Sequence, residues 1–114
     1  PEPNTGVHEI TSRATDMGRF RAPSLRNIAV TAPYMHDGSV ATLEDAIRNY
    51  AAAGRNLTAG PNAGDGRMNP YKDGFISGFS ITDDEINDLI DFLQSLTDDQ
   101  FLNSERFADP WATP

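Results

Sequence analysis

Two amphipathic segments, one on each side of a glycine-rich stretch, limit what this chain of 114 residues can fold into. Each segment has apolar residues at helical spacing on one face only, so each predicts a surface helix of about a dozen residues. Two such helices cannot enclose a core by themselves, because each apolar face has to be buried against another element. The sequence therefore predicts that a third element or a cofactor covers the two apolar faces.

The first segment begins at Thr42, a typical helix N-cap residue, and ends at Gly54, which we expect just after the last helical turn. Its apolar face consists of Leu43, Ala46, Ile47, Tyr50 and Ala51. Tyr50 is the unusual member, since its position predicts a buried ring whose hydroxyl needs a hydrogen-bond partner. A core tyrosine bonded to a backbone carbonyl and a functional tyrosine both remain open at this point.

The second segment begins with Thr82-Asp83-Asp84-Glu85, which has the form of a capping box. Its apolar face consists of Ile86, Leu89, Ile90, Leu93 and Leu96. Residues 55–80, between the two helices, are rich in glycine and proline and predict a long loop, which is usually functional or disordered. Residues 1–22 show no helical period and are expected to be extended, while Pro23 can begin a short turn of helix.

The charge balance excludes several function classes. Nine basic and seventeen acidic residues give a net charge of −8, which argues against nucleic acid and against an anionic membrane surface as partners. No apolar run approaches the length of a membrane-spanning helix, so no membrane span is expected. The chain has no cysteine, which rules out disulfides and thiolate metal ligands. It opens at Pro1 without a leader, and we expect a mature product or a fragment.

Arginine and histidine supply the candidate binding residues. Four arginines and one aspartate gather in residues 13–26, where guanidinium groups suit a bound dianion or the propionates of a cofactor; an ordinary surface cluster is the alternative. Of the two histidines, His8 is expected to be ordinary. His36 lies in a tight loop before the first helix, where a structural role is the alternative to a functional one. No second histidine or carboxylate stands at zinc spacing from it.

One run of sequence is distinctive. From Gly18 to Glu44 the chain reads GRFRAPSLRNIAVTAPYMHDGSVATLE, with the pattern PSLRN, then TAPY-x-HDGS, then ATLE unbroken. This run resembles the C-terminal domain of the bacterial di-haem cytochrome c peroxidase and MauG superfamily. The resemblance continues in four further motifs: YAAAGR at 50–55, NPYK at 69–72, FLQSLTD at 92–98 and DPW at 109–111. The ending is most similar to the MbnH-like branch, the di-haem enzymes linked to methanobactin and copper uptake.

The resemblance implies an all-α fold of two cytochrome c-like domains, each holding one covalently attached haem c. Residues 23–114 would be the C-terminal, distal half of the second haem domain, with long loops, and residues 1–22 an inter-domain segment. Attachment needs Cys-x-x-Cys-His, which this chain lacks. A haem-bearing N-terminal segment is therefore expected as a partner, either from a longer protein that was cut or as a separate chain. Attachment of haem c also implies the periplasm.

The family's metal ligands transfer to three positions. The distal axial ligand of the second haem lies fourteen residues past the His of His-Asp-Gly, a position held here by Tyr50. Met35 is the second choice of ligand. The family binds Ca²⁺ between the haems through backbone carbonyls that correspond to those of Thr31 and Pro33, and such oxygens are suitable calcium ligands.

The resemblance also implies contacts with the cofactor itself. Arg26, and Arg21 beside it, would meet haem propionates, and His36 would lie near the inter-haem region. The family places methionine at position 50 in its peroxidase members and tyrosine in its MauG-like and MbnH-like members. A thioether favours reduced iron, whereas a phenolate stabilises oxidised iron and lowers the potential.

Tyrosine at this position therefore predicts a MauG-like enzyme. Such an enzyme uses hydrogen peroxide to reach a bis-Fe(IV) state and oxidises an aromatic residue, in this branch a Trp converted to kynurenine, of a partner protein such as a copper-binding periplasmic protein. The first alternative is a di-haem cytochrome c peroxidase that takes electrons from a small redox protein. The second, from another class, is a haem-free binding module.

Overall fold

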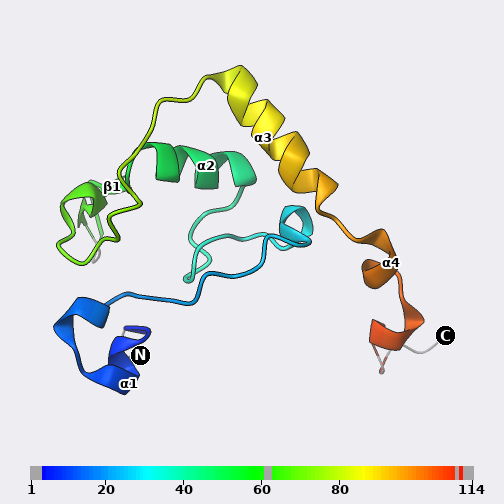
Figure 1. Cartoon of the computed structure of the whole chain (residues 1–114), viewed down its shortest axis with the longest axis horizontal. Helices are drawn as coiled ribbons and strands as arrows, with labels where there is room; N and C mark the ends of the chain where they lie inside the picture. Colours follow the sequence, from blue (N-terminus) through cyan, green and yellow to red (C-terminus); the bar gives the residue numbers. More distant parts are fainter. Residues whose placement is uncertain (1–3, 61–62, 110, 112–114) are drawn as a thin grey trace.

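The structure is a computed structural model that describes residues 4–60, 63–109 and 111, an open arrangement of short helices joined by long connections (Figure 1). Its elements follow the chain in this order: α1 (His8–Thr11), η1 (Ala14–Asp16), η2 (Ile28–Val30), α2 (Leu43–Ala51), β1 (Asn56–Leu57), β2 (Gly64–Asp65), η3 (Gly66–Met68), α3 (Asp83–Ser95), α4 (Asp99–Leu102) and η4 (Glu105–Phe107). Here η denotes a 3₁₀-helix. Within the described ranges no helix is long and apolar enough to cross a bilayer.

Helix α2 begins as the sequence predicts. The Thr42 hydroxyl accepts a hydrogen bond from the Asp45 backbone N–H at 3.0 Å, which satisfies one of the free N–H groups of the first turn. The helix ends one residue earlier than the position of Gly54 suggests. Ala52 is the C-cap, and the next residue, Ala53, takes the left-handed conformation with φ +62°.

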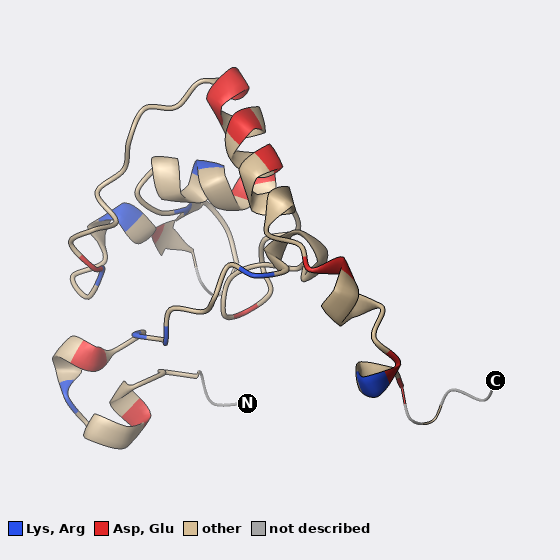
Figure 2. Ribbon diagram, turned by 45° about the vertical axis from the view of Figure 1, so that its right-hand side comes forward, with Lys and Arg blue, Asp and Glu red and all other residues tan. Residues whose placement is uncertain are grey.

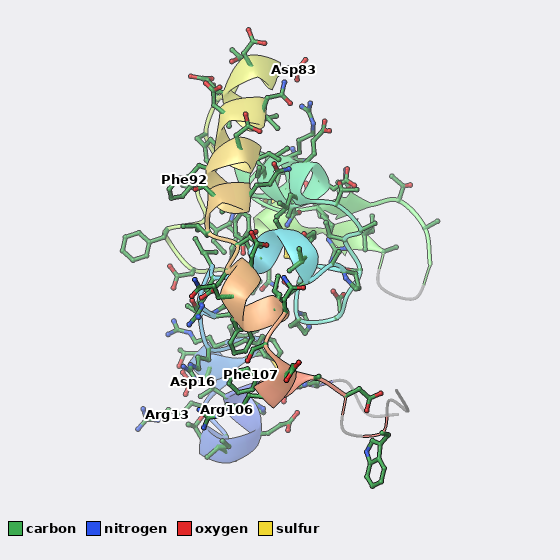
Figure 3. The ribbon with its side chains drawn as sticks, turned by 90° about the vertical axis from the view of Figure 1, so that its right-hand side faces the viewer. Arg13, Asp16, Asp83, Phe92, Arg106 and Phe107 are labelled. Atoms are coloured by element: carbon green, nitrogen blue, oxygen red, sulfur yellow. The ribbon has the colours of Figure 1, made fainter. Side chains whose placement is uncertain are left out.

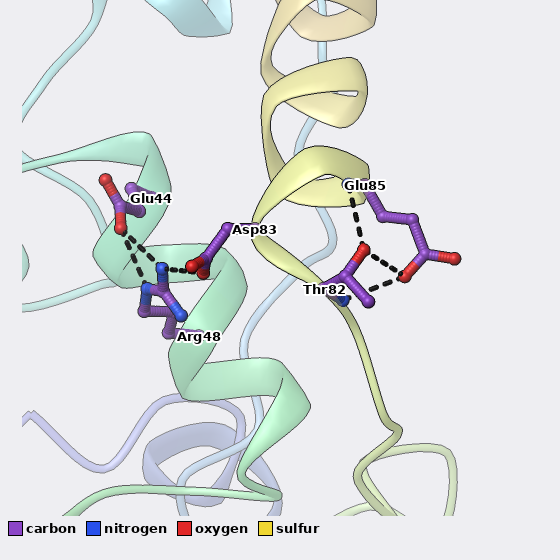
Figure 4. Close-up of polar contacts among 5 residues, drawn as sticks. All are labelled: Glu44, Arg48, Thr82, Asp83 and Glu85. Carbon is purple, nitrogen blue, oxygen red and sulfur yellow. Dashed lines mark hydrogen bonds and ion pairs between the residues drawn. The ribbon is translucent and has the colours of Figure 1, made fainter.

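Helix α3 has the predicted capping box (Figure 4). The Thr82 hydroxyl accepts from the Glu85 N–H at 3.3 Å, and the Glu85 carboxylate accepts from the Thr82 N–H at 2.8 Å. Arg48 on α2 donates to Glu44 of its own helix and to Asp83 at the start of α3, at 2.8 and 2.7 Å. Because these charged groups are exposed, their ion pairs add little to the free energy of unfolding. They do show that the start of α3 lies next to α2.

The core is small. Ile47 of α2 packs against Ile86 and Leu93 of α3, with half-buried apolar residues around them. The radius of gyration is 17.2 Å, whereas a compact domain of this length has about 13 Å. The accessible surface is 9177 Å², against roughly 6,100 Å² for a compact protein of this mass. The prediction that the two helices cannot enclose a core of their own is confirmed.

Asn27, in the PSLRN motif, ties the chain before α2 to the end of α3. It is the buried polar residue of the described core, 8% exposed, and its backbone is left-handed with φ +63°. Its N–H donates to the Leu96 carbonyl at 3.1 Å, and its side-chain oxygen accepts from the Asp98 N–H at 2.6 Å. These bonds place η2 against α3.

Two parts of the chain differ from expectation. The segment before residue 23 is not extended throughout, because α1 and η1 form in it and the Val7 N–H bonds to the Arg19 carbonyl at 2.9 Å. The loop of residues 55–80 contains a two-stranded antiparallel sheet, β1 with β2, in which Asn56 pairs with Asp65. The described chain is thus mainly helix and loop, and the all-α expectation holds only in part.

Candidate functional site

Tyr50 lies in the last turn of α2, and its side chain is 48% exposed. The expectation of a buried ring is therefore wrong. Tyr50 is not among the residues of the core formed by Ile47, Ile86 and Leu93 or those packed against it. No partner for its hydroxyl is found among the described residues, whereas the Tyr34 hydroxyl donates to the Ile28 carbonyl at 3.0 Å. Tyr34 is thus the partly buried tyrosine that bonds to a carbonyl, and the Tyr50 hydroxyl has no such bond to the described residues.

The neighbour of Tyr50 in sequence carries a second unpaired group. The side-chain oxygen of Asn49 is buried and accepts no hydrogen bond from the described residues. A buried acceptor without a donor costs about 1–3 kcal/mol, so a donor from water or from a bound group is expected there. The end of α2 thus offers two side-chain oxygen atoms for which residues 4–60, 63–109 and 111 supply no hydrogen-bond partner.

The loop of the TAPYMHDGS motif exposes backbone oxygens. Tyr34 and Val40 pair in an antiparallel bridge that closes the loop. Before it, the N–H and hydroxyl of Thr31 both donate to the Ile28 carbonyl, at 3.3 and 3.1 Å. The carbonyls of Thr31 and Pro33 accept no hydrogen bond from the described residues, so they are available to a cation. In the part of the chain that the structure describes, no cluster of three His, Asp or Glu side chains could hold a metal on its own.

His36 stacks on Phe20, with ring centroids 4.2 Å apart and an angle of 19° between the planes. This contact joins the N-terminal segment to the motif loop. Next to His36, the Ser39 side chain donates to Asp37 and Arg55 lies 3.6 Å away, which together hold the pKa of the Asp37 carboxyl below its usual value. The same Arg55 donates to the Ser39 hydroxyl at 2.7 Å, so the loop is tied to the residue that follows α2.

Arg26 has a partner within the chain. Its guanidinium forms an ion pair with Asp98 and lies 5.2 Å from the centre of the Phe101 ring. The Phe101 N–H and then Arg26 lower the pKa of the Asp98 carboxyl. No ion pair of Arg21 is found among the described residues, and its side chain is exposed. Of the two arginines expected at haem propionates, Arg26 already has an acidic partner, whereas Arg21 has none among the described residues.

Exposed apolar side chains are abundant around these residues. Figure 3 shows Phe92 on the outside of α3 and Phe107 close to Arg106 near the C-terminal end. Large apolar residues that are more than half exposed are Ile10, Val30, Met68, Phe75, Phe79, Phe92, Phe107 and Trp111. A chain that folds alone rarely leaves so many, so this surface fits one that a cofactor or further polypeptide covers. Tyr50 thus belongs to a chain with much uncovered apolar surface, as a residue that binds a cofactor would.

Comparisons with known proteins show which family the chain resembles. No family model matches the chain. It is 35% identical to a cytochrome-c peroxidase of Denitromonas iodatirespirans over 92 residues, which are 81% of this chain and 21% of that protein. It is 34% identical to the methylamine utilization protein MauG of Paracoccus denitrificans over 93 residues, 74% of this chain and 24% of that protein.

A solved structure is similar over nearly the whole chain. It is the crystal structure of a MauG-like protein associated with microbial copper homeostasis, with 55% identity and a TM-score of 0.91 over 98% of this chain and 35% of that one. The likeness fits part of a cytochrome c-like domain. The chain belongs to the MauG and cytochrome c peroxidase superfamily. It spans about a quarter or less of the curated relatives named above.

Three groups near the site were missed by the sequence reasoning. Phe20 stacks on His36, Asp98 engages both Arg26 and Asn27, and Lys72 donates to the end of α2. Each contact joins residues far apart in sequence. A motif can mark such residues as belonging to the family, but only the fold reveals their partners.

Proposed function

We propose that this chain is the distal half of the second haem domain in a MauG-like di-haem enzyme and that Tyr50 is an axial ligand of that haem. The observation that carries the proposal is the state of Tyr50. It stands fourteen residues after His36, which lies in the unbroken family motif, and it is half exposed with its hydroxyl unpaired among the described residues. An anionic phenolate oxygen is a ligand that stabilises oxidised iron.

The chemistry supplied by the cofactor is oxidation. Two c-type haems, when bound, would supply the oxidising chemistry, with hydrogen peroxide as the oxidant and an aromatic residue, Trp, of a partner protein as the group oxidised. The role of this chain would be to hold one iron through the Tyr50 phenol oxygen. The likeness to a protein associated with copper homeostasis supports a partner that binds copper in the periplasm and the MbnH-like branch.

The remaining site residues have supporting roles. The free carbonyls of Thr31 and Pro33 would contribute two ligands to Ca²⁺, with the others from outside this chain. Exposed Arg21 would pair with a haem propionate, and Arg26 would reach one only by sharing its guanidinium with Asp98. His36, held by Phe20, would line the region between the haems.

A second candidate function is a cytochrome c peroxidase that draws electrons from a small redox protein. The 35% identity to a protein of that name favours it. The two candidates differ at position 50, because a thioether ligand there would raise the haem potential and a phenolate lowers it. Tyrosine at this position favours the MauG-like candidate.

The test is Tyr50→Phe in the complete haem-loaded protein. We expect the tyrosinate-to-iron signal in the resonance Raman spectrum to disappear and peroxide no longer to produce the near-infrared band of the two coupled Fe(IV) haems. Tyr34→Phe is the matched control, since it removes only a bond to the Ile28 carbonyl and should leave both signals intact. Retention of both signals in Tyr50→Phe would refute the proposal. A colourless preparation from a host that matures haem c would instead favour the haem-free binding module.

A further inference from the structure

The segment of residues 69–79, which we call the strap, crosses the C-terminal end of α2. The Phe79 N–H donates to the Ala51 carbonyl at 3.0 Å, and the Lys72 ammonium donates to the Ala53 carbonyl at 3.2 Å. The last carbonyls of a helix have no partner within the helix. The strap therefore supplies the hydrogen bond that the last carbonyl of α2, that of Ala51, lacks within the helix, and a second hydrogen bond to the Ala53 carbonyl just beyond the C-cap.

The strap lies as close to the helix as backbone allows. Gly78 has φ +82°, and a Cβ at this position would lie 2.8 Å from the Ala51 carbonyl oxygen and 3.2 Å from the Ala53 Cβ. Any other residue would push the strap away from the helix and strain the backbone. Glycine at position 78 is thus needed for the contact between Phe79 and Ala51.

Lys72 is presented to the helix by a turn. The Asn69 side chain accepts from the Tyr71 N–H at 2.9 Å, and the Asn69 carbonyl accepts from the Lys72 N–H at 3.1 Å. The side chain of Lys72 is half-buried, and it is the only lysine of the chain. A cation at the C-terminal end of a helix also interacts favourably with the partial negative charge of the free carbonyls.

The two carbonyls that the strap engages, those of Ala51 and Ala53, both follow Tyr50 closely in the chain. The Tyr50 carbonyl itself accepts from the Ala53 N–H at 3.0 Å, so movement at Ala53 is transmitted directly to the backbone of Tyr50. The remaining described contacts of α2 with α3, through Ile47 and Arg48, lie earlier along the helix. The last turn of α2 therefore depends on the strap for its position.

We propose that Lys72 is a positioning residue for Tyr50: by binding the Ala53 carbonyl, it holds the last turn of α2 so that the phenol oxygen reaches the haem iron. This inference rests on the proposed function, because it assigns Lys72 a role only if Tyr50 is a ligand. The strap acts through the backbone, and Lys72 does not contact the cofactor.

The experiment compares Lys72→Met and Lys72→Arg with Arg48→Met in the complete haem-loaded protein. Methionine keeps the length of the side chain but cannot donate, and arginine restores a cationic donor. Arg48→Met removes the ion pairs of Arg48 with Glu44 and Asp83 and leaves both hydrogen bonds of the strap in place. The readouts are the tyrosinate-to-iron Raman signal and amide hydrogen exchange in residues 50–54.

In Lys72→Met we expect faster exchange in residues 50–54, by about tenfold for the loss of one hydrogen bond to a charged donor, and a weaker Raman signal with a second haem species. Lys72→Arg should recover both readouts in large part, and Arg48→Met should change neither. If Lys72→Met keeps the full signal while Tyr50→Phe abolishes it, the positioning role is wrong and the proposed function stands. If Tyr50→Phe keeps the signal, the proposed function itself fails.

Discussion

The contact between α2 and α3 buries its apolar side chains, whereas the surface that includes Tyr50 leaves them exposed. At the contact, Ile86 is 1% exposed and the start of α3 is capped by its own residues. At Tyr50 and in the strap, large aromatic side chains stay exposed: Tyr50 is 48% and Phe75 98% exposed. The outer side of α3 carries a row of acidic residues in keeping with contact to water (Figure 2). One region is complete within this chain, and the other has the surface of an interior that something else must cover.

The largest change in the free energy of unfolding is expected at the contact between α2 and α3. Ile86→Ala should lower the free energy of unfolding by about 2–5 kcal/mol, because it leaves a cavity between α2 and α3. Phe75→Ala is the matching substitution at an exposed aromatic residue. It should change the free energy of unfolding by no more than about 0.5 kcal/mol if the Phe75 ring is in water. Urea denaturation of the complete haem-loaded protein measures both. A loss in Phe75→Ala close to that of Ile86→Ala would show that the ring is covered there, which would sharpen the contrast.

A smaller loss of stability is expected at Asn27, which ties the chain before α2 to the end of α3. Asn27→Ala should cost about 1–3 kcal/mol, because the buried Asp98 N–H loses its acceptor and alanine disfavours φ +63°. Asn27→Gly tolerates the left-handed backbone and removes only the acceptor, so its loss should be smaller. Equal midpoints in urea for the wild type and Asn27→Ala would contradict the role of Asn27.

The smallest effect concerns acid. The Thr82 N–H and hydroxyl lower the pKa of the Glu85 carboxyl, so this group stabilises the folded state above its unfolded pKa and loses that contribution as the pH falls through its lowered folded value. Between about pH 5 and that value, Glu85→Gln should flatten part of the fall in melting temperature seen in the wild type. Thr82→Ala should flatten it too, and should cost about 1 kcal/mol at neutral pH through loss of the cap. If the melting temperature of both variants fell with pH as steeply as that of the wild type, the hydrogen bonds of Glu85 to Thr82 would not be the cause of this acid sensitivity.

Periodicity and caps were sufficient to predict the two main helices. Thr42 and Thr82 cap α2 and α3 as expected, and Ile47, Ile86 and Leu93 form the core because each lies at the centre of its apolar face. The smallness of that core also followed from the sequence. These features depend on residues close together in the chain, where spacing carries the information.

Features that depend on distant contacts could not be predicted in this way. Strands β1 and β2 consist of residues with low strand propensity, and they pair because the chain returns past α2, where the Gly66 N–H bonds to the Arg55 carbonyl. Tyr50 has the spacing of a core residue but is 48% exposed and not part of the core. The partner of Arg26 is Asp98, seventy-two positions away, so charge clustering near Arg26 gave no sign of it.

The excess surface has a consequence for how such a molecule matures. Any group that binds the open face of the folded form, and not the unfolded chain, shifts the folding equilibrium by mass action. With so few buried side chains of its own, this polypeptide would gain a large part of its stability at the moment its prosthetic group and neighbouring segment are in place. Assembly and folding would then be a single event, and small-angle scattering before and after loading would record it as a contraction from the 17.2 Å radius.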